Sequence, residues 1–189
     1  MVLIGPPGAG KSTVGRVLAE RLGVDFRDTD DLIREDLGST IPEIFTRHGE
    51  AGFRRIEEHV VRAALVAHRG ILALGGGAVL SGATRALLLD RTVVCLDVDV
   101  EEGLRRIAID SDRPLFTGAN LAADYAEVLR QRQPLYRDAA RIVVETSGRT
   151  PDHIAHAVLA GLGLRSRAGG EGAGDQDTIV SGPDLGSKP

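Results

Sequence analysis

Short apolar runs alternate with longer segments of helical periodicity along most of the chain. Short apolar runs are typical of buried strands, and apolar residues at spacings of three and four are typical of helices. Five runs predict strands: Val2–Ile4, Val24–Arg27, Ile71–Leu74, Thr92–Val98 and Arg141–Glu145. Five segments predict helices: Lys11–Leu22, Glu50–His68, Thr84–Leu89, Glu101–Ile107 and Asp152–Leu162. This alternation predicts an α/β fold of three layers, in which a five-stranded parallel sheet carries helices on both faces.

The pattern changes after residue 164. Arg165–Pro189 is rich in Gly, Ser and Asp and has no periodic apolar face, which predicts a disordered tail. A tethering or regulatory role is the alternative for this segment. The 189 residues leave room for one α/β domain. We therefore expect one domain over residues 1–164, followed by the tail at residues 165–189.

Composition narrows the range of partners. Hydrophobic residues make up 42% of the chain and aromatic residues only 3%, which predicts an aliphatic core. Few aromatic rings leave few platforms for stacking bases, and a net charge of −4 gives no basic field to attract a polyanion. Nucleic-acid binding is therefore disfavoured, although a local arginine cluster can still hold a small anion.

The cysteine count and the lack of targeting patterns suggest the cellular setting. Cys95 is the sole cysteine and lies in an apolar run, which predicts a buried structural thiol and excludes an intrachain disulfide. No signal-peptide pattern and no apolar run of transmembrane length occurs. We expect a cytoplasmic monomer that contacts no membrane. The histidines have no metal-binding spacing, and His153 and His156 are expected on a solvated helix face.

A phosphate-binding motif follows the first predicted strand. Residues 5–12 read Gly-Pro-Pro-Gly-Ala-Gly-Lys-Ser and match G-x-x-x-x-G-K-[ST] at every fixed position. Glycines let backbone N–H groups converge on phosphate oxygens, and the following helix adds its positive end. Lys11 is expected near the β- and γ-phosphates, and the Ser12 hydroxyl on Mg²⁺. We predict nucleoside triphosphate binding by Gly8, Ala9, Gly10, Lys11, Ser12 and Thr13.

Acidic residues follow the second predicted strand. Asp28 and Asp30 are two apart and would point the same way in an extended chain. One could hold Mg²⁺ through water while the other accepts hydrogen bonds from substrate hydroxyls. Capping of the next helix by Asp30 or Asp31 is a role that can coexist with these. Asp97 follows an apolar run in a Walker B pattern and competes for the Mg²⁺ role, with a plain strand-end role as the alternative.

Two further segments are candidates to contact an acceptor. Gly75, Gly76 and Gly77 end the third predicted strand, where their backbone N–H groups can approach a ligand closely. A plain flexible turn is the alternative. Arg54 and Arg55 are adjacent on a predicted helix and point about 100° apart, so at most one faces a crevice easily. The pattern alone favours a solvated Arg54.

Taken in chain order, these segments resemble the shikimate kinase family. The motifs are G-x-P-G-x-G-K-S-T, D-T-D, F-R-x-x-E, G-G-G, R-P-L and R-x-P-L-Y, and they extend from about Met1 to Leu162. The resemblance implies the nucleoside-monophosphate-kinase-like P-loop fold, with ATP, Mg²⁺ and a mobile lid over about residues 108–120. Phe116 stands where the family often has another Leu, which concerns the packing of the lid.

The resemblance also implies a role for each matching residue. On the nucleotide side, Lys11 and Arg113 reach the phosphates, Arg106 packs on adenine, and Ser12 and Asp28 associate with Mg²⁺. On the acceptor side, two arginines grip the shikimate carboxylate, an aspartate binds ring hydroxyls, and aromatic rings flank the pocket. The implied acceptor set is Asp30, Phe45, Phe53, Arg54, Gly75, Gly76, Gly77 and Arg132.

The predicted activity is phosphorylation of the 3-hydroxyl of shikimate by ATP, with Lys11, Asp30 and Arg113 as the catalytic residues. Arginine suits a carboxylate because its planar guanidinium can bind both oxygens at once. A kinase of the same fold that acts on gluconate or a nucleoside monophosphate is the first alternative. The second is a non-catalytic nucleotide-binding module, although such a module needs no pair of carboxylate-binding arginines.

Overall fold

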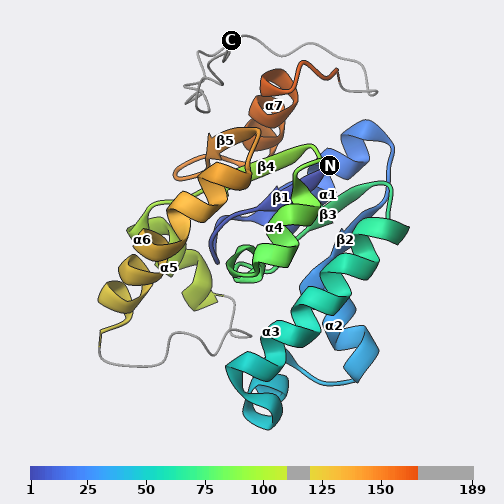
Figure 1. Cartoon of the computed structure of the whole chain (residues 1–189). Helices are drawn as coiled ribbons and strands as arrows, with labels where there is room; N and C mark the ends of the chain where they lie inside the picture. The colour runs from blue at the N-terminus through green and yellow to red at the C-terminus, as the bar shows by residue number, and fades with distance from the viewer. Residues whose placement is uncertain (110–119, 166–189) are drawn as a thin grey trace, which may run out of the picture.

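The computed structural model describes residues 1–109 and 120–165, which form a sheet between helices (Figure 1). The predicted lid, about residues 108–120, and the predicted tail, residues 165–189, lie almost wholly outside the described residues, so both stay predictions. The strands are β1 (Val2–Ile4), β2 (Phe26–Asp28), β3 (Ile71–Ala73), β4 (Val93–Asp97) and β5 (Ile142–Glu145). The helices are α1 (Lys11–Leu22), α2 (Thr29–Leu37), α3 (Ile41–Ala67), the 3₁₀ helix η1 (Ala78–Leu80), α4 (Gly82–Leu88), α5 (Val100–Ile109), α6 (Leu121–Ala139) and α7 (Pro151–Gly161). None of these helices is long and apolar enough to cross a membrane.

The five strands form one parallel sheet in the order β2-β3-β1-β4-β5, as predicted. Central β1 pairs on both sides, so that Leu3 lies beside Ala73 of β3 and Val94 of β4. The chain therefore passes from one side of β1 to the other between β3 and β4. In parallel sheets a crevice opens at such a switch point, beyond the carboxyl ends of the strands. The glycine-rich loop after β1 begins at this position.

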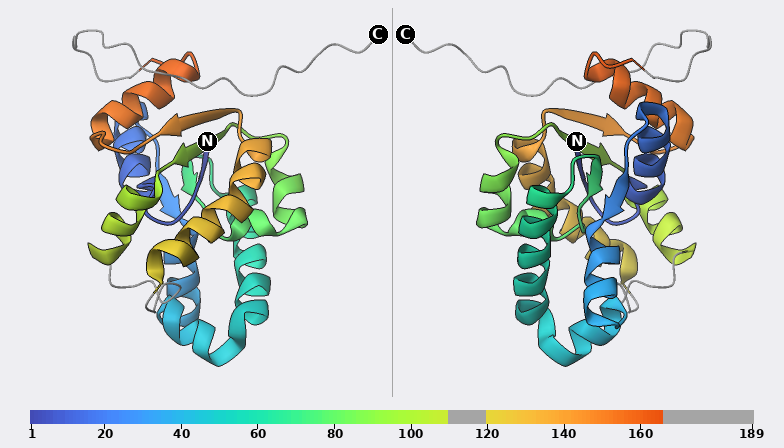
Figure 2. Two further views of the ribbon diagram at one scale, coloured as in Figure 1. Left: turned by 90° about the vertical axis from the view of Figure 1, so that its left-hand side faces the viewer. Right: turned by 90° about the vertical axis from the view of Figure 1, so that its right-hand side faces the viewer.

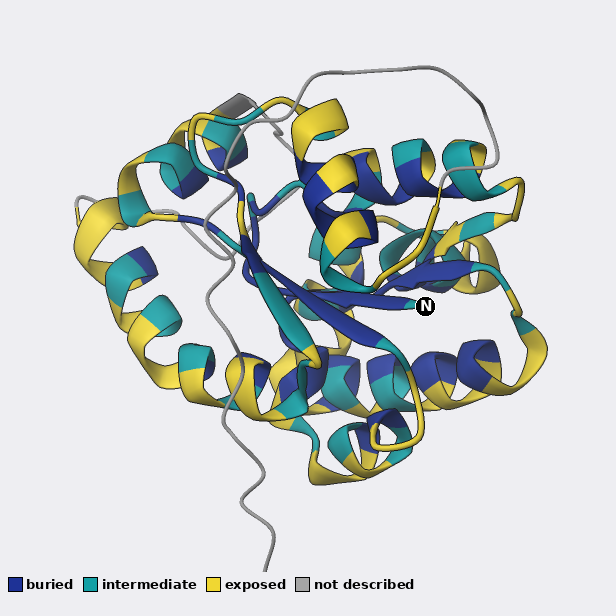
Figure 3. Ribbon diagram, turned by 90° about the horizontal axis from the view of Figure 1, so that it is seen from above, coloured by how far each residue is buried: buried dark blue, intermediate teal, exposed yellow. Residues whose placement is uncertain are grey.

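Two hydrophobic clusters cover the two faces of the sheet, whose strands are buried between helices (Figure 3). Successive side chains of a strand point to opposite faces. Leu3 accordingly packs in the cluster with α1 and α7, whereas Val2 and Ile4 pack in the cluster with α3, α4 and α6. The buried members of both clusters are aliphatic apart from Cys95 and Tyr136, as the composition predicts.

Cys95 lies on β4 as the buried thiol that the sequence predicts. Its side chain belongs to the cluster that faces α3, α4 and α6. Burial raises the pKa of the Cys95 thiol to about 12, and the neighbouring Asp97 carboxylate acts in the same direction. The thiol is therefore protonated at neutral pH and serves as a small apolar side chain.

A helical hairpin of α2 and the first part of α3 extends away from the sheet (Figure 2). Thr40 caps α3 by accepting from the Glu43 amide, and the Glu43 carboxylate accepts from the Thr40 amide in return. Gly49 interrupts α3 with φ 65° and ψ 175°. The predicted helix Glu50–His68 is the part after this break, and Phe53 in it packs against Ile33 and Ile44 of the hairpin.

The structure departs from the predicted elements at β2 and in several helices. β2 begins at Phe26 rather than Val24, whose residue is 41% exposed, and it extends to Asp28. The helices α2 and η1, the first part of α3 and the whole of α6 were not among the predicted helical segments. The inner face of α6 carries Tyr125, Val128 and Leu129 in one cluster and Leu135 and Tyr136 in another, but polar residues 130–133 and Pro134 interrupt this stripe in the sequence.

Candidate active site

A cleft of about 500 Å³ collects nearly all the predicted site residues. It lies where the loop after β1, the start of α2, the middle of α3 and the loop after β3 meet, with one arginine each from α5 and α6. The predicted residues that line it are Gly8, Gly10, Lys11, Ser12, Thr13, Asp28, Asp30, Phe45, Phe53, Arg54, Gly75, Gly76, Gly77, Arg106 and Arg132. Ala9 does not line the cleft, because its methyl group is fully buried in the core beneath α1. Arg113 lies outside the described residues.

The loop after β1 has the geometry of a phosphate site. Gly10 precedes α1 with φ 83° and ψ 18°, a left-handed conformation that favours glycine, and it gives the helix no side-chain cap. The first N–H groups of α1 are therefore not satisfied by a capping side chain and lie at the positive end of the helix dipole. The Lys11 ammonium donates to the carbonyls of Gly5 and Pro6, both at 2.9 Å. Backbone and side chain thus concentrate positive charge at one end of the cleft.

Asp28 joins the phosphate loop to α2. Its Oδ2 accepts a hydrogen bond from the Ser12 hydroxyl at 2.5 Å, and its Oδ1 accepts from the Asp30 amide at 2.9 Å. Asp28 is therefore the helix cap, so the alternative in which Asp30 or Asp31 caps this helix does not hold. The reason is that α2 starts at Thr29, directly after the strand. Asp30 is in the first helical turn and still lines the cleft.

Asp97 takes the strand-end role rather than the competing metal role. Its Oδ1 accepts from the Val98 amide at 3.1 Å, and its Oδ2 accepts from the Gln133 side chain at 3.2 Å. Asp97 does not line the cleft that contains Ser12 and Asp28. The Walker B pattern in this chain therefore marks the end of β4.

Arg54 is held in the cleft by acidic and aromatic neighbours, not solvated as the pattern alone favours. Its Nη1 donates to the Glu57 carboxylate at 2.6 Å, and its guanidinium lies 5.4 Å from the centre of the Phe53 ring. Phe53 stacks on Phe45 with ring centres 4.2 Å apart. A Cβ atom on Gly77 would lie 1.9 Å from Arg54 Nη1, so the guanidinium rests against the backbone of the glycine loop.

Glu57 is the main site residue that the sequence analysis did not single out. It is 3% exposed, and burial raises the pKa of its carboxyl group against the opposing effect of Arg54. A Cβ atom on Gly75 would lie 2.6 Å from oxygens of both Glu57 and Asp30, so the two carboxylates flank the same glycine. The signal was present in the F-R-x-x-E motif, because residues three apart lie on one helix face. Other lining residues without a predicted binding role are Pro7, Arg16, Asp31, Arg34 and Ile41.

Arg132 reaches the cleft from α6, whereas Arg54 reaches it from α3. It is 8% exposed, and its Nη1 donates to the Gly76 carbonyl at 3.2 Å. The same carbonyl accepts the Tyr136 hydroxyl at 2.5 Å. The Gly75 amide donates to the Thr29 hydroxyl at 3.0 Å. The glycine loop is therefore held by side chains of α2 and α6 and is not the plain flexible turn of the alternative.

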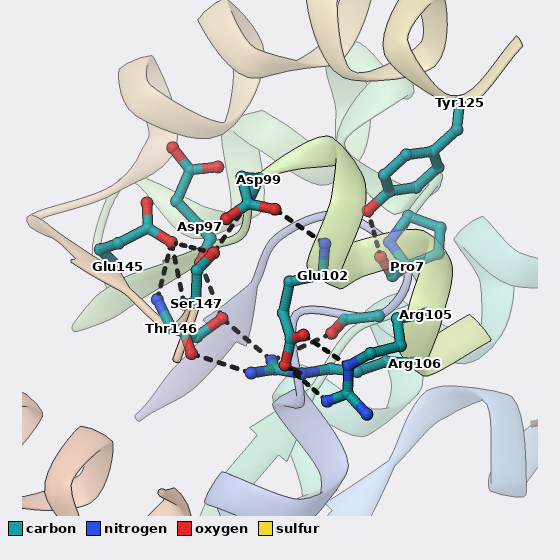
Figure 4. Close-up of polar contacts among 11 residues, drawn as sticks. Pro7, Asp97, Asp99, Glu102, Arg105, Arg106, Tyr125, Glu145, Thr146 and Ser147 are labelled. Carbon is teal, nitrogen blue, oxygen red and sulfur yellow. Dashed lines mark hydrogen bonds and ion pairs between the residues drawn. The ribbon is translucent and has the colours of Figure 1, made fainter. Parts of the chain in front are cut away.

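Arg106 lies beside the phosphate loop in a polar network (Figure 4). It donates to the Gly8 carbonyl at 3.3 Å and to the Thr146 carbonyl at 2.8 Å. Its Nε also donates to Glu102 at 2.8 Å. Hydrogen bonds from Arg105 above all, and from Arg106, lower the pKa of Glu102 to about 2, so this carboxylate is ionised. The network fixes the guanidinium plane next to the phosphate loop.

A phosphate loop at the switch point of a parallel sheet, with an arginine-bearing pocket beside it, suits phosphoryl transfer from a nucleotide to a small anionic acceptor, and fold and cleft fit the class of small-molecule kinases. A model of the shikimate kinase family matches residues 7–162. The shikimate kinase of Rhodococcus erythropolis is 52% identical over 161 residues, which make up 85% of this chain and 95% of the relative. The chain belongs to the shikimate kinase family.

Solved structures agree with the predicted fold. A shikimate kinase from Acinetobacter baumannii in complex with shikimate has a TM-score of 0.81 and 41% identity, over 84% of this chain and 89% of that chain. A gluconokinase from Sinorhizobium meliloti 1021 has a TM-score of 0.54 and 16% identity, over 86% and 90%. The second likeness concerns the fold alone. The prediction of a nucleoside-monophosphate-kinase-like P-loop fold is confirmed.

Proposed function

We propose that the chain transfers the terminal phosphoryl group of ATP to the 3-hydroxyl of shikimate, giving shikimate 3-phosphate and ADP. The observation that carries this proposal is that Arg54 of α3 and Arg132 of α6 line the same cleft as the phosphate loop. Two guanidinium groups beside a nucleotide site fit an acceptor that carries a carboxylate. The family membership and the shikimate complex of the Acinetobacter baumannii enzyme support the same acceptor.

The nucleotide side fits the triphosphate of ATP. The start of α1 offers backbone N–H groups without a side-chain cap, and Lys11 adds a positive charge in the same loop. Arg106 lies close enough to Gly10 that a Cβ atom there would be 3.7 Å from its Nη1. We assign Arg106 to the adenine end of the nucleotide, because a flat guanidinium held on three sides can stack on a base.

The pair of Ser12 and Asp28 fits a magnesium ion. Their oxygens lie 2.5 Å apart at the edge of the phosphate loop, and Mg²⁺ prefers hydroxyl, carboxylate and water oxygens as ligands. These two residues would hold the ion next to the phosphates. When bound, Mg²⁺ supplies positive charge that neutralises the triphosphate.

The acceptor side fits a cyclic acid with several hydroxyl groups. Arg54 and Arg132 would bind the carboxylate, and hydrogen bonds of this charged kind contribute roughly 1.5–3 kcal/mol each. The stacked rings of Phe45 and Phe53 line the pocket beside them. The Asp30 carboxylate adjoins Gly75 and accepts hydrogen bonds only, so it suits the ring hydroxyls.

In the reaction, the 3-hydroxyl oxygen forms a bond to the γ-phosphorus while the bond from phosphorus to the bridging oxygen breaks. ADP leaves with the electron pair of that bond, and the hydroxyl proton is released. A loose transition state needs little help from a base, so Asp30 orients the hydroxyl rather than removing its proton early. Lys11 stabilises charge on the phosphates, and we assign Arg113 to the same task from the predicted lid, on its R-P-L motif.

A coupled assay of ADP release with a panel of acceptors tests the proposal. Shikimate should give the highest kcat/KM, above gluconate and nucleoside monophosphates, and Lys11→Met should abolish turnover. A higher kcat/KM with gluconate than with shikimate would favour the alternative of a gluconate kinase of the same fold. ATP binding without turnover on any acceptor would leave only the nucleotide-binding module and refute the proposal.

We further propose that the active form is a monomer, because one chain supplies every described residue of the cleft. Sedimentation velocity at assay concentrations should give a single species near the mass of one chain. A stable dimer under those conditions would contradict this part of the proposal.

A further inference from the structure

Two buried tyrosines project from the inner face of α6. Tyr125 is 0% exposed and Tyr136 is 2% exposed. They are eleven residues apart in the sequence, which is close to three helical turns, so they lie on the same face with about 16 Å between them along the axis. They are the two largest fully buried side chains in the described part of the chain. Their hydroxyl groups are buried away from water, so each needs a hydrogen-bond partner within the protein.

Each hydroxyl donates to a backbone carbonyl in a different loop of the cleft. Tyr125 donates to the carbonyl of Pro7 in the phosphate loop at 2.6 Å (Figure 4). Tyr136 donates to the carbonyl of Gly76 in the glycine loop at 2.5 Å. Both Pro7 and Gly76 line the cleft. One helix therefore contacts the nucleotide loop at its first end and the acceptor loop further along.

The surroundings hold both hydroxyl groups in place. A Cβ atom on Gly103 would lie 2.3 Å from the Tyr125 oxygen, so α5 closes off the space behind this ring. Burial raises the pKa of Tyr136 well above its usual value, against a smaller opposing effect of Arg132. Its hydroxyl is therefore neutral and remains a donor at physiological pH. Arg132 donates to the same Gly76 carbonyl, so Tyr136 and Arg132 act on one atom.

The two loops also touch each other. A Cβ atom on Gly76 would lie 2.9 Å from Cδ of Pro7, so the rigid proline ring packs directly against the glycine loop. A shift of either loop therefore alters the space beside the other. Because α6 holds both the Pro7 carbonyl and the Gly76 carbonyl, it sets the spacing between the phosphate loop and the glycine loop.

We propose that Tyr125 and Tyr136 are positioning residues, each holding one substrate loop by its carbonyl, so that α6 sets the distance between the nucleotide phosphates and the acceptor. The assignment rests on the proposed function. Tyr125 governs the nucleotide side through Pro7. Tyr136 governs the acceptor side through Gly76 and the neighbouring Arg132. If the two tyrosines only filled the core, removing either hydroxyl group would not affect the binding of one substrate more than that of the other.

The test is a pair of Tyr→Phe variants, which remove only the hydroxyl group and keep the ring. Tyr125→Phe should raise the KM for ATP by about 3- to 10-fold and leave the KM for shikimate within about 2-fold. Tyr136→Phe should raise the KM for shikimate by about 3- to 10-fold and leave the KM for ATP within about 2-fold. The double variant should also lower kcat, because both loops are then released. Gly103→Ala, which crowds the Tyr125 oxygen, should reproduce the effect on ATP by an independent route.

Ile154→Val is the matched control for stability. Ile154 is 2% exposed in the cluster with α1 and α7, to which neither tyrosine belongs, and shortening its side chain should lower the melting temperature. This variant should leave both KM values unchanged. Tyr→Phe variants that behave like Ile154→Val, or that change both KM values by the same factor, would overturn the proposal.

Refutation of the proposed function can be distinguished from refutation of the two tyrosine roles. Wild-type protein without shikimate-dependent turnover would refute the acceptor, and the nucleotide half would then be measured by calorimetric titration of ADP. Weaker ADP binding in Tyr125→Phe but not in Tyr136→Phe would still support the role of Tyr125. Equal ADP affinity in both variants and wild type would overturn it.

Discussion

Substitution of Gly77 by alanine should weaken acceptor binding, because the added methyl group displaces the Arg54 guanidinium. The backbone at Gly77 has φ −97° and ψ −9°, which alanine adopts without strain. The added Cβ atom would lie 1.9 Å from Nη1 and 2.4 Å from Cζ of Arg54. Carbon and nitrogen atoms need roughly 3.5 Å, so the guanidinium must retreat by roughly 1.6 Å. A flexible side chain can make this movement, so the fold should survive.

The cost of the displacement follows from the hydrogen bonds that Arg54 forfeits. A charged hydrogen bond contributes roughly 1.5–3 kcal/mol, which corresponds to an increase of about 10- to 150-fold in the KM for shikimate. The KM for ATP should stay within about 2-fold, because Lys11 and the start of α1 are unchanged. The melting temperature should fall by only a few degrees, since about 1 kcal/mol corresponds to roughly 2–4 °C in a protein of this size.

Steady-state kinetics with each substrate varied in turn, and a thermal melt, measure these effects. Gly82→Ala is the matched control, because the nearest atom to its added Cβ would be Nη2 of Arg85 at 3.7 Å. This control should leave both KM values unchanged. The reasoning is refuted if folded Gly77→Ala binds shikimate as wild type does, or if its KM for ATP rises by the same factor.

Three further predictions test other parts of the site and core. Arg132→Ala should raise the KM for shikimate by about 10- to 150-fold and that for ATP by less than about 2-fold, and equal increases would contradict the assignment. Glu57 holds a proton in the folded state at pH values above 4.5 at which the unfolded chain has lost it, so wild-type stability should fall as the pH rises from there through the raised pKa. The melting temperature of Glu57→Gln relative to wild type should therefore increase over that range, and a difference independent of pH would count against a buried acid. Cys95, with its pKa raised to about 12, should resist a thiol reagent at pH 8 until denaturant is added, and rapid labelling of native protein would show that the thiol is exposed.

The sequence identified most residues of the candidate site but only some of the contacts that they make. Fifteen of the predicted residues line one cleft, because the phosphate loop, Asp28 and the glycine loop follow the carboxyl ends of strands, and the family resemblance added residues of α3, α5 and α6. The sequence analysis considered only Asp30 and Asp31 as possible helix caps and not Asp28, since the exact boundary between β2 and α2 is not visible in the sequence. Glu57 had no assigned role, because its burial depends on how α3 packs against the glycine loop.

By itself, the sequence determined the phosphate loop, the order of the five strands along the chain, and the aliphatic character of the core. These features depend on residues adjacent in the chain, through backbone conformation and the alternation of apolar side chains. Only the tertiary structure decided that Arg54 and Arg132 share a cleft, and that α6 joins the phosphate loop to the glycine loop through Tyr125 and Tyr136. Such contacts join residues far apart in the chain, and their distances depend on how whole helices pack on the sheet, which no local pattern encodes.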